Sequence, residues 1–136
     1  MTSKTNTIKA LNELGRFLNQ FSSESMSKDD SVFYNDLFFE GFKHQIKLSS
    51  EHNGWFSKTN LLFSIKNWST LLNTVSLNNW TSKYNFENIS QKNVAIIMAG
   101  NIPLVGFHDF LCALICNHKI IIKQSSNDKH LLPFLV

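Results

Sequence analysis

The sequence has few of the residues that cross-link or bend a chain: two cysteines, two prolines and five glycines among 136 residues. Cys112 and Cys116 lie four residues apart in a helix-like segment, a spacing that does not suggest a disulfide framework and favours a reducing compartment. With 43% hydrophobic and 12% aromatic residues, the chain is too apolar to be intrinsically disordered. We therefore expect a globular, cytoplasmic protein of one-domain length.

Charge of one sign is also scarce. The formal net charge is +3, and the lysines are scattered rather than gathered into the basic run that nucleic-acid-binding proteins carry. The longest apolar stretches are interrupted by His108, Asp109, His118 and Lys119, so none is long enough to span a membrane. The polar segment 1–7 lacks the apolar core of a signal peptide. We expect no nucleic-acid partner and no membrane span.

The chain before Asn93 has the hydrophobic pattern of helices, with apolar residues at spacings of three and four. The pattern predicts one helix ending near Phe21, a second at about Ser31–Leu48 and a helical pair within Thr59–Tyr84. The segment 49–54 should break the second helix, because it contains an Asn-Gly turn signal. The predicted apolar stripes are Ile8, Leu11, Leu14, Leu18 and Phe21; Val32, Leu37, Phe38, Phe42 and Ile46; and Leu61, Leu62, Ile65, Trp68, Leu71, Leu72 and Val75. The tryptophans Trp55, Trp68 and Trp80 are interpreted as core or interface anchors.

The chain after Asn93 has a different pattern. Val94–Met98 and Lys119–Lys123 are rich in β-branched residues without polar alternation, which is typical of parallel strands buried on both faces. The segment between them predicts a helix that begins at Pro103 and ends near Asn117. The fold class is therefore α/β: a mostly helical region over residues 1–92, then a partial Rossmann-like βαβ unit with parallel strands over residues 93–136.

The end of the chain is unusual for a complete domain. Two parallel strands alone leave sheet edges and faces uncovered. The segment Asn127–Val136 begins another helix and stops on an apolar residue, with no glycine cap and no third strand. We therefore expect the chain to be a truncated piece of a larger protein.

Two loops follow the predicted strands, Ala99–Pro103 after the first and Lys123–Ser126 after the second. The carboxyl ends of parallel strands open on one sheet edge, where α/β proteins bind ligands, and a helix N-terminus there favours anionic groups. The chain has no Gly-x-Gly-x-x-Gly fingerprint, so an ordinary Rossmann pyrophosphate turn is not supported.

The residues of these loops carry a family resemblance. The segments GNIPLVGFHDFL at 100–111, KQSS at 123–126 and LLPFL at 131–135 resemble the acyl-CoA reductases related to the fatty acid reductase of bacterial bioluminescence, within the aldehyde dehydrogenase superfamily. The resemblance implies the N-terminal fragment of an enzyme that reduces an acyl-CoA to an aldehyde through a cysteine acyl-enzyme. It places the catalytic cysteine downstream of Lys123, and neither Cys112 nor Cys116 matches it. This chain alone is expected to be inactive.

The resemblance also implies residue roles. Asn101 matches the family asparagine whose side-chain amide holds the thioester or thiohemiacetal oxygen. Three positions before it match backbone that lines the cofactor cleft: Met98, Ala99 and Gly100.

The second loop bears on the choice of nicotinamide cofactor. Lys123 matches the lysine that contacts the adenosine ribose, and Ser125 and Ser126 match the Ser-Glu pair that follows it. A glutamate at position 126 would repel a 2′-phosphate, whereas serine leaves room for it and Lys123 can pair with it. We expect NADPH, with NADH still open, and an acyl-CoA substrate; a homo-oligomer of the full-length parent also stays open.

Several residues have plainer interpretations. Cys112 and Cys116 could ligate a metal, but apolar neighbours favour packing, and no metal site is expected. His108-Asp109 could be a base and its orienter, but an acidic residue in a first helical turn is ordinary dipole compensation. Asn101 could be a turn residue only. Two other functions remain open: a nucleotide-binding module without catalysis, and a helical interaction module.

Overall fold

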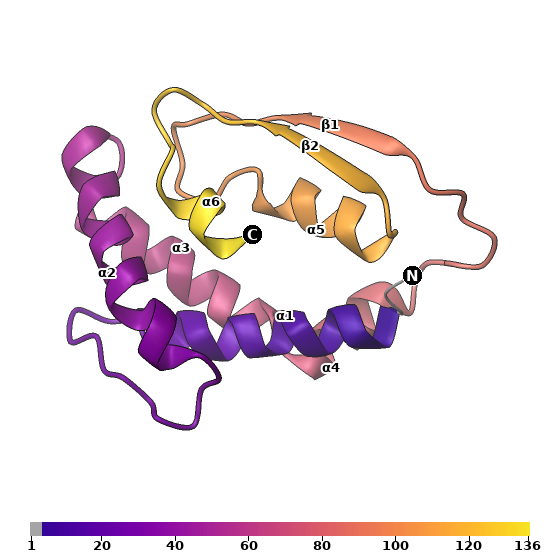
Figure 1. The fold of residues 1–136 in the computed structure, drawn as a ribbon, viewed down its shortest axis with the longest axis horizontal. Helices are drawn as coiled ribbons and strands as arrows, with labels where there is room; N and C mark the ends of the chain where they lie inside the picture. Colours follow the sequence, from indigo (N-terminus) through magenta and orange to yellow (C-terminus); the bar gives the residue numbers. More distant parts are fainter. Residues whose placement is uncertain (1–3) are drawn as a thin grey trace.

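The structure is a computed structural model that describes residues 4–136 (Figure 1). Four helices come first, and a strand, a helix, a second strand and a short final helix follow. The elements are α1 Lys4–Asn19, α2 Asn35–His52, α3 Lys58–Leu71, α4 Thr74–Thr81, β1 Asn93–Ile97, α5 Phe107–Ile115, β2 Lys119–Lys123 and α6 Leu131–Leu135. The change from helices to strands near Asn93 is where the sequence predicts it. None of the helices within residues 4–136 is both long and apolar enough to cross a bilayer.

The first helix is amphipathic and lies against α3. Its predicted face is largely buried, with Ile8, Leu11 and Leu18 at 5%, 4% and 0% exposure. Gly15 lies where α1 meets the chain just after α3, and a Cβ there would collide with the Leu72 backbone. Burial of this stripe is the main source of helix stability, because an isolated helix of this length is marginal in water.

The two strands pair in parallel, as the sequence predicts. Asn93 lies opposite Lys119 and Ile97 opposite Lys123. Helix α5 lies between this sheet and α1 (Figure 1) and buries Phe107 and Leu111 completely or nearly so. The arrangement confirms a mixed α/β structure with a strand–helix–strand connection.

Burial of the strands on both faces was a wrong prediction. Ile96 faces α5 and is 8% exposed, whereas Ile97 and Ile121 on the outer face are 79% and 62% exposed. Successive strand residues point to opposite faces, and α5 covers only one of them in the described part of the chain. A continuous apolar run therefore does not prove cover on both sides.

Helix boundaries differ from the predictions where the backbone turns left-handed. Helix α5 begins at Phe107 rather than Pro103, because Leu104 has φ 59° and residues 101–106 form turns. Helix α2 begins at Asn35 because Tyr34 has φ 61°, and it runs four residues past the predicted end at Leu48 to His52, inside the segment 49–54 that was predicted to break it. Positive φ is costly for residues with a Cβ, so neither position can lie inside a right-handed helix.

Some predicted apolar contacts are exposed instead. In α2 the buried stripe is Phe39, Phe42 and Ile46, while Leu37 and Phe38 are 73% and 46% exposed. Phe39 lies three residues before Phe42, which lies four before Ile46, so the three share one helix face. Leu37 lies five residues before Phe42 and leaves this face. Phe38 lies four residues before Phe42 and contacts the Phe134 ring while staying partly exposed. Further along the chain, Leu71, Val75 and Trp55 are also exposed, so Trp55 is not a core anchor.

The final helix joins the core rather than extending away from it. Leu131 is fully buried and Leu132 nearly so, and the Phe134 ring lies 5.5 Å from the Phe42 ring of α2. A single cluster of buried apolar side chains includes residues from α1 to α6. The helical region and the βαβ unit thus share one core.

Candidate functional site

Two loops leave the same end of the parallel sheet, on the left in Figure 1. The first loop (residues 98–106) joins β1 to α5, and the second loop (residues 124–130) joins β2 to α6. The Met98 amide donates a hydrogen bond to the Lys123 carbonyl at 3.0 Å, which continues the sheet pairing into the loops. Asn101 and Lys123 therefore lie at one edge of the sheet, as the sequence predicts.

The loops are in direct contact at Gly100. A Cβ on this residue would lie 2.8 Å from the Ser125 Cβ and 3.1 Å from the Asn127 Cβ. Real Cβ atoms do not approach that closely, so the contact requires glycine for space rather than for an unusual backbone angle. Gly100 and Ser125, both predicted as cofactor-binding residues, are thus brought together.

The predicted site residues differ in their exposure. Ala99, Asn101, Lys123 and Ser126 are exposed at this edge, whereas Met98, Gly100 and Ser125 are partly buried between the loops. The Ser125 hydroxyl accepts a hydrogen bond from the Asn127 amide at 3.2 Å, so it also shapes its own loop. Groups that could donate to a ligand, the Asn101 amide and the Lys123 ammonium, are the exposed ones.

A hollow of about 490 Å³ adjoins Asn101 and is lined mainly by apolar side chains of α3 and the first loop. The Ser64 hydroxyl of α3 donates to the Pro103 carbonyl at 2.7 Å, which holds the loop against the helix. Phe63, Leu71 and Ile102 line the hollow and remain 68%, 54% and 55% exposed. An apolar chain placed there would cover side chains that now face water.

Asp128 is a titratable residue of the second loop that the sequence did not single out. Burial raises the pKa of its carboxyl, opposed by hydrogen bonding to the Leu131 and His130 amides and by the charge of His130. Its Oδ1 atom is buried and finds no hydrogen-bond partner among the described residues. It borders a small cavity beneath the first loop, next to Leu104 and Phe107. No local pattern distinguishes it from an ordinary loop aspartate.

Asn53 is a second residue that the sequence missed. The sequence indicates an Asn-Gly turn there and gives Asn53 no role in the site, but the Asn53 side chain is buried and its amide nitrogen donates to the Gly100 and Asn127 carbonyls at 2.8 and 2.9 Å. Both contacts span more than forty residues of sequence, so a local pattern could not reveal them.

The cysteines have the environment of structural residues. Cys112 lies in α5 and Cys116 is its C-cap residue, and both are partly buried; burial, together with Asp109 and Cys116, raises the pKa of the Cys112 thiol. A raised pKa reduces the thiolate, which is the nucleophilic form. His108 lies 3.8 Å from the Cys112 sulfur and 3.9 Å from the Asp109 carboxylate, and both His108 and Asp109 are exposed. Within residues 4–136, no three His, Cys, Asp or Glu side chains gather closely enough to hold a metal ion.

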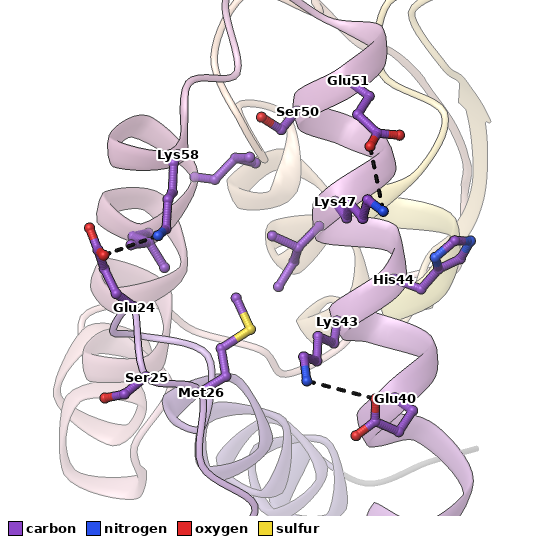
Figure 2. Close-up of a pocket in the computed structure, with 13 residues that line it drawn as sticks. Glu24, Ser25, Met26, Glu40, Lys43, His44, Lys47, Ser50, Glu51 and Lys58 are labelled. Atoms are coloured by element: carbon purple, nitrogen blue, oxygen red, sulfur yellow. Dashed lines mark hydrogen bonds and ion pairs between the residues drawn. The ribbon is translucent and has the colours of Figure 1, made fainter.

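A roomier hollow of about 760 Å³ lies away from the loops, between α2, α3 and the connector before α2 (Figure 2). Three lysines on its rim, Lys43, Lys47 and Lys58, each face a glutamate, and the Lys58–Glu24 pair spans 3.0 Å. Exposed ion pairs of this kind contribute little, and their charges cancel at the rim. The hollow lacks the unpaired cation that an anionic cofactor needs, so the loop edge is the better candidate.

Comparisons of the chain with protein-family models, with curated proteins and with solved structures find no match.

Proposed function

We propose that this chain is the N-terminal part of an NADPH-dependent acyl-CoA reductase. The observation that carries the proposal is the contact at Gly100, because it joins the first and second loops at the carboxyl edge of a parallel sheet. Parallel α/β sheets bind nucleotides at this edge. The family resemblance of the same two loops supplies the chemistry: hydride transfer from a nicotinamide to a thioester.

The cofactor would lie across the two loops. Lys123 is exposed at the end of β2 and can pair with a ribose hydroxyl or a 2′-phosphate. Ser126, three residues after Lys123 in the second loop, is exposed and adds no negative charge. The backbone of Met98, Ala99 and Gly100 would line the cleft. This balance of charge supports NADPH over NADH as the cofactor.

The acyl chain of the substrate would lie in the hollow between α3 and the first loop. Asn101 borders this hollow, so its side-chain amide could donate to the thioester oxygen while the chain covers Phe63, Leu71 and Ile102. Burial of apolar surface contributes about 0.8 kcal/mol per CH₂ group, which favours long acyl chains. The proposal assigns the nucleophile to a cysteine outside this chain.

Binding of a thioether analogue of a long-chain acyl-CoA tests this assignment by calorimetry. We expect Leu71→Asp to weaken binding about tenfold or more, because a carboxylate in the hollow must lose water when the chain enters. Leu37→Asp is the matched control, since Leu37 is equally apolar and 73% exposed on α2. Equal affinities for the two variants would contradict the assignment.

Catalysis provides a second test. The chain mixed with NADPH and an acyl-CoA should form no aldehyde, because the acyl-enzyme cysteine is not in it. Measurable aldehyde would contradict the proposal.

A second candidate is a nucleotide-binding module without catalysis. The single core shared by the helices and the βαβ unit favours it, because such a unit can fold alone. A cooperative melt that NADPH shifts upward, with no affinity for the acyl-CoA analogue, would support this function instead.

A further inference from the structure

We infer that Asn53 is a positioning residue: its side chain fixes the distance between the first and second loops and thereby sets the affinity of the site for a dinucleotide. The inference rests on the proposed function for the dinucleotide, but the link between the loops stands on geometry alone.

The Asn53 side chain uses both hydrogens of its amide nitrogen on the two loops. Nδ2 donates to the Gly100 carbonyl at 2.8 Å and to the Asn127 carbonyl at 2.9 Å. The Oδ1 atom accepts from the Trp55 amide at 3.0 Å. The reverse orientation of the amide would set oxygen against two carbonyl oxygens, so the partners define one orientation. The residue is 4% exposed, which shields these bonds from water.

Two backbone hydrogen bonds that do not involve the loops hold Asn53 in place. Its amide donates to the Ser49 carbonyl at 3.2 Å, which closes the last turn of α2. Its carbonyl accepts from the amide of Phe56 at 2.9 Å, and Phe56 is 1% exposed in the core. The side chain therefore projects from a backbone that hydrogen bonds hold on both its amide and its carbonyl side.

The bridge lies where the loops touch. Gly100 packs on Ser125 and Asn127, and Asn53 bonds to the carbonyls of Gly100 and Asn127 themselves. Without the amide, two carbonyl oxygens at this contact would lose their donor, and an unpaired polar group destabilises the structure around it. The loops would then separate or admit water. A ligand that spans both loops would meet a wider and less ordered cleft.

The neighbouring residue makes a second link to the same segment. His52 Nδ1 lies 2.8 Å from His130 Nε2, and His130 Nδ1 lies 3.1 Å from Gln45 Oε1. This pair joins the end of α2 to the end of the second loop but does not reach the first loop. Asn53, the C-cap residue of α2, bonds to both loops at once.

Hydrogen–deuterium exchange and NADPH calorimetry on the full chain test the inference. In Asn53→Asp, a carboxylate faces two carbonyl oxygens, so we expect amide exchange in segments 98–101 and 124–128 to rise about tenfold or more. NADPH affinity should fall by a similar factor. If this variant does not fold, Asn53→Ser retains one donor and should show the same changes at smaller size.

Asn35→Asp is the matched control. Asn35 is also 4% exposed, and its amide nitrogen donates to Gln20 and to the Asp29 carbonyl, far from the loops. We expect Asn35→Asp and Asn53→Asp to lower the melting temperature by similar amounts. In Asn35→Asp, however, loop exchange and NADPH affinity should stay within about twofold of the parent.

The outcomes separate this inference from the proposed function. The positioning role would be overturned if loop exchange were unchanged in the Asn53 variants. It would also be overturned if Asn35→Asp raised loop exchange and lowered NADPH affinity as much as Asn53→Asp does. Faster loop exchange with unchanged NADPH affinity would overturn the claim that Asn53 sets the affinity for a dinucleotide. If the parent chain binds no NADPH, the proposed function fails, and exchange alone decides whether Asn53 links the loops.

Discussion

Ser126 is the residue whose side chain would decide between NADPH and NADH. It is exposed in the second loop, three residues after Lys123. We expect Ser126→Glu to weaken NADPH binding about tenfold, because a carboxylate repels the 2′-phosphate, and to leave NADH binding within about twofold. Calorimetry with both cofactors measures this ratio. Ser82→Glu, at another exposed serine, controls for the added charge, and an equal loss for both cofactors would refute the role.

Asp128 makes stability depend on pH at the same loop. Burial raises the pKa of its carboxyl above the unfolded value, so the folded state favours the protonated form. The penalty for ionisation is absent at pH below the unfolded pKa of about 3.9 and grows as pH rises through it toward the folded pKa. Near neutral pH the folded chain thus holds a carboxylate that the unfolded chain hydrates better.

We expect Asp128→Asn to melt at a higher temperature than the parent at pH 7, by an amount that corresponds to about 1 kcal/mol. The gain should shrink as the pH approaches 3.5, because both side chains are then neutral. Thermal melts of the two proteins from pH 3.5 to 7.5 measure the difference. A gain that stays constant with pH would show that ionisation of Asp128 is not its cause.

The strands β1 and β2 show which features of the secondary structure could be predicted from the sequence. The β-branched run predicted the strand, its parallel partner and the end at which Lys123 lies, because these follow from local propensity and chain direction. The run suggested burial on both faces, whereas the presence of only two strands within the predicted unit already indicated uncovered faces. Pro103 likewise marks the approach to α5, but the positive φ of Leu104 delays the helix to Phe107.

One pair of substitutions in β1 tests this one-sided burial. Ile96→Ala should cost about 2–3 kcal/mol of unfolding free energy, because Ile96 faces α5 and is 8% exposed. Ile97→Ala should cost about 0.5 kcal/mol or less, because Ile97 is 79% exposed on the outer face. Urea denaturation of both variants gives the comparison. Similar costs would mean that the outer face is covered in solution.

Some residues of the candidate site could be predicted from the sequence, and Asn53 could not. Gly100, Asn101, Lys123 and Ser126 follow directly from strand ends, so chain order alone places them at one edge. Asn53 belongs to it through contacts across more than forty residues, and Asn-Gly is a common turn pair. Sequence patterns report local structure, and such long-range hydrogen bonds are set by packing of whole elements.

The whole molecule places its helices behind the site rather than around it. Helix α5 lies between the sheet and α1, and α2 and α3 support the second and first loops from the same side. Asn101 and Lys123, at the end of the sheet where the loops begin, are exposed. The arrangement gives a rigid base to two exposed loops, which is what a cofactor site needs.

Nuclear magnetic resonance mapping of NADPH on the isotopically labelled chain tests whether the first and second loops bind the cofactor. We expect backbone amide shifts to gather in residues 98–101 and 123–127 and to saturate with added NADPH. Lys123→Ala should weaken this binding, because the cation that pairs with ribose or phosphate is lost. Shifts confined to the hollow between α2 and α3, or none at either loop at millimolar NADPH, would rule out a cofactor site at the loops.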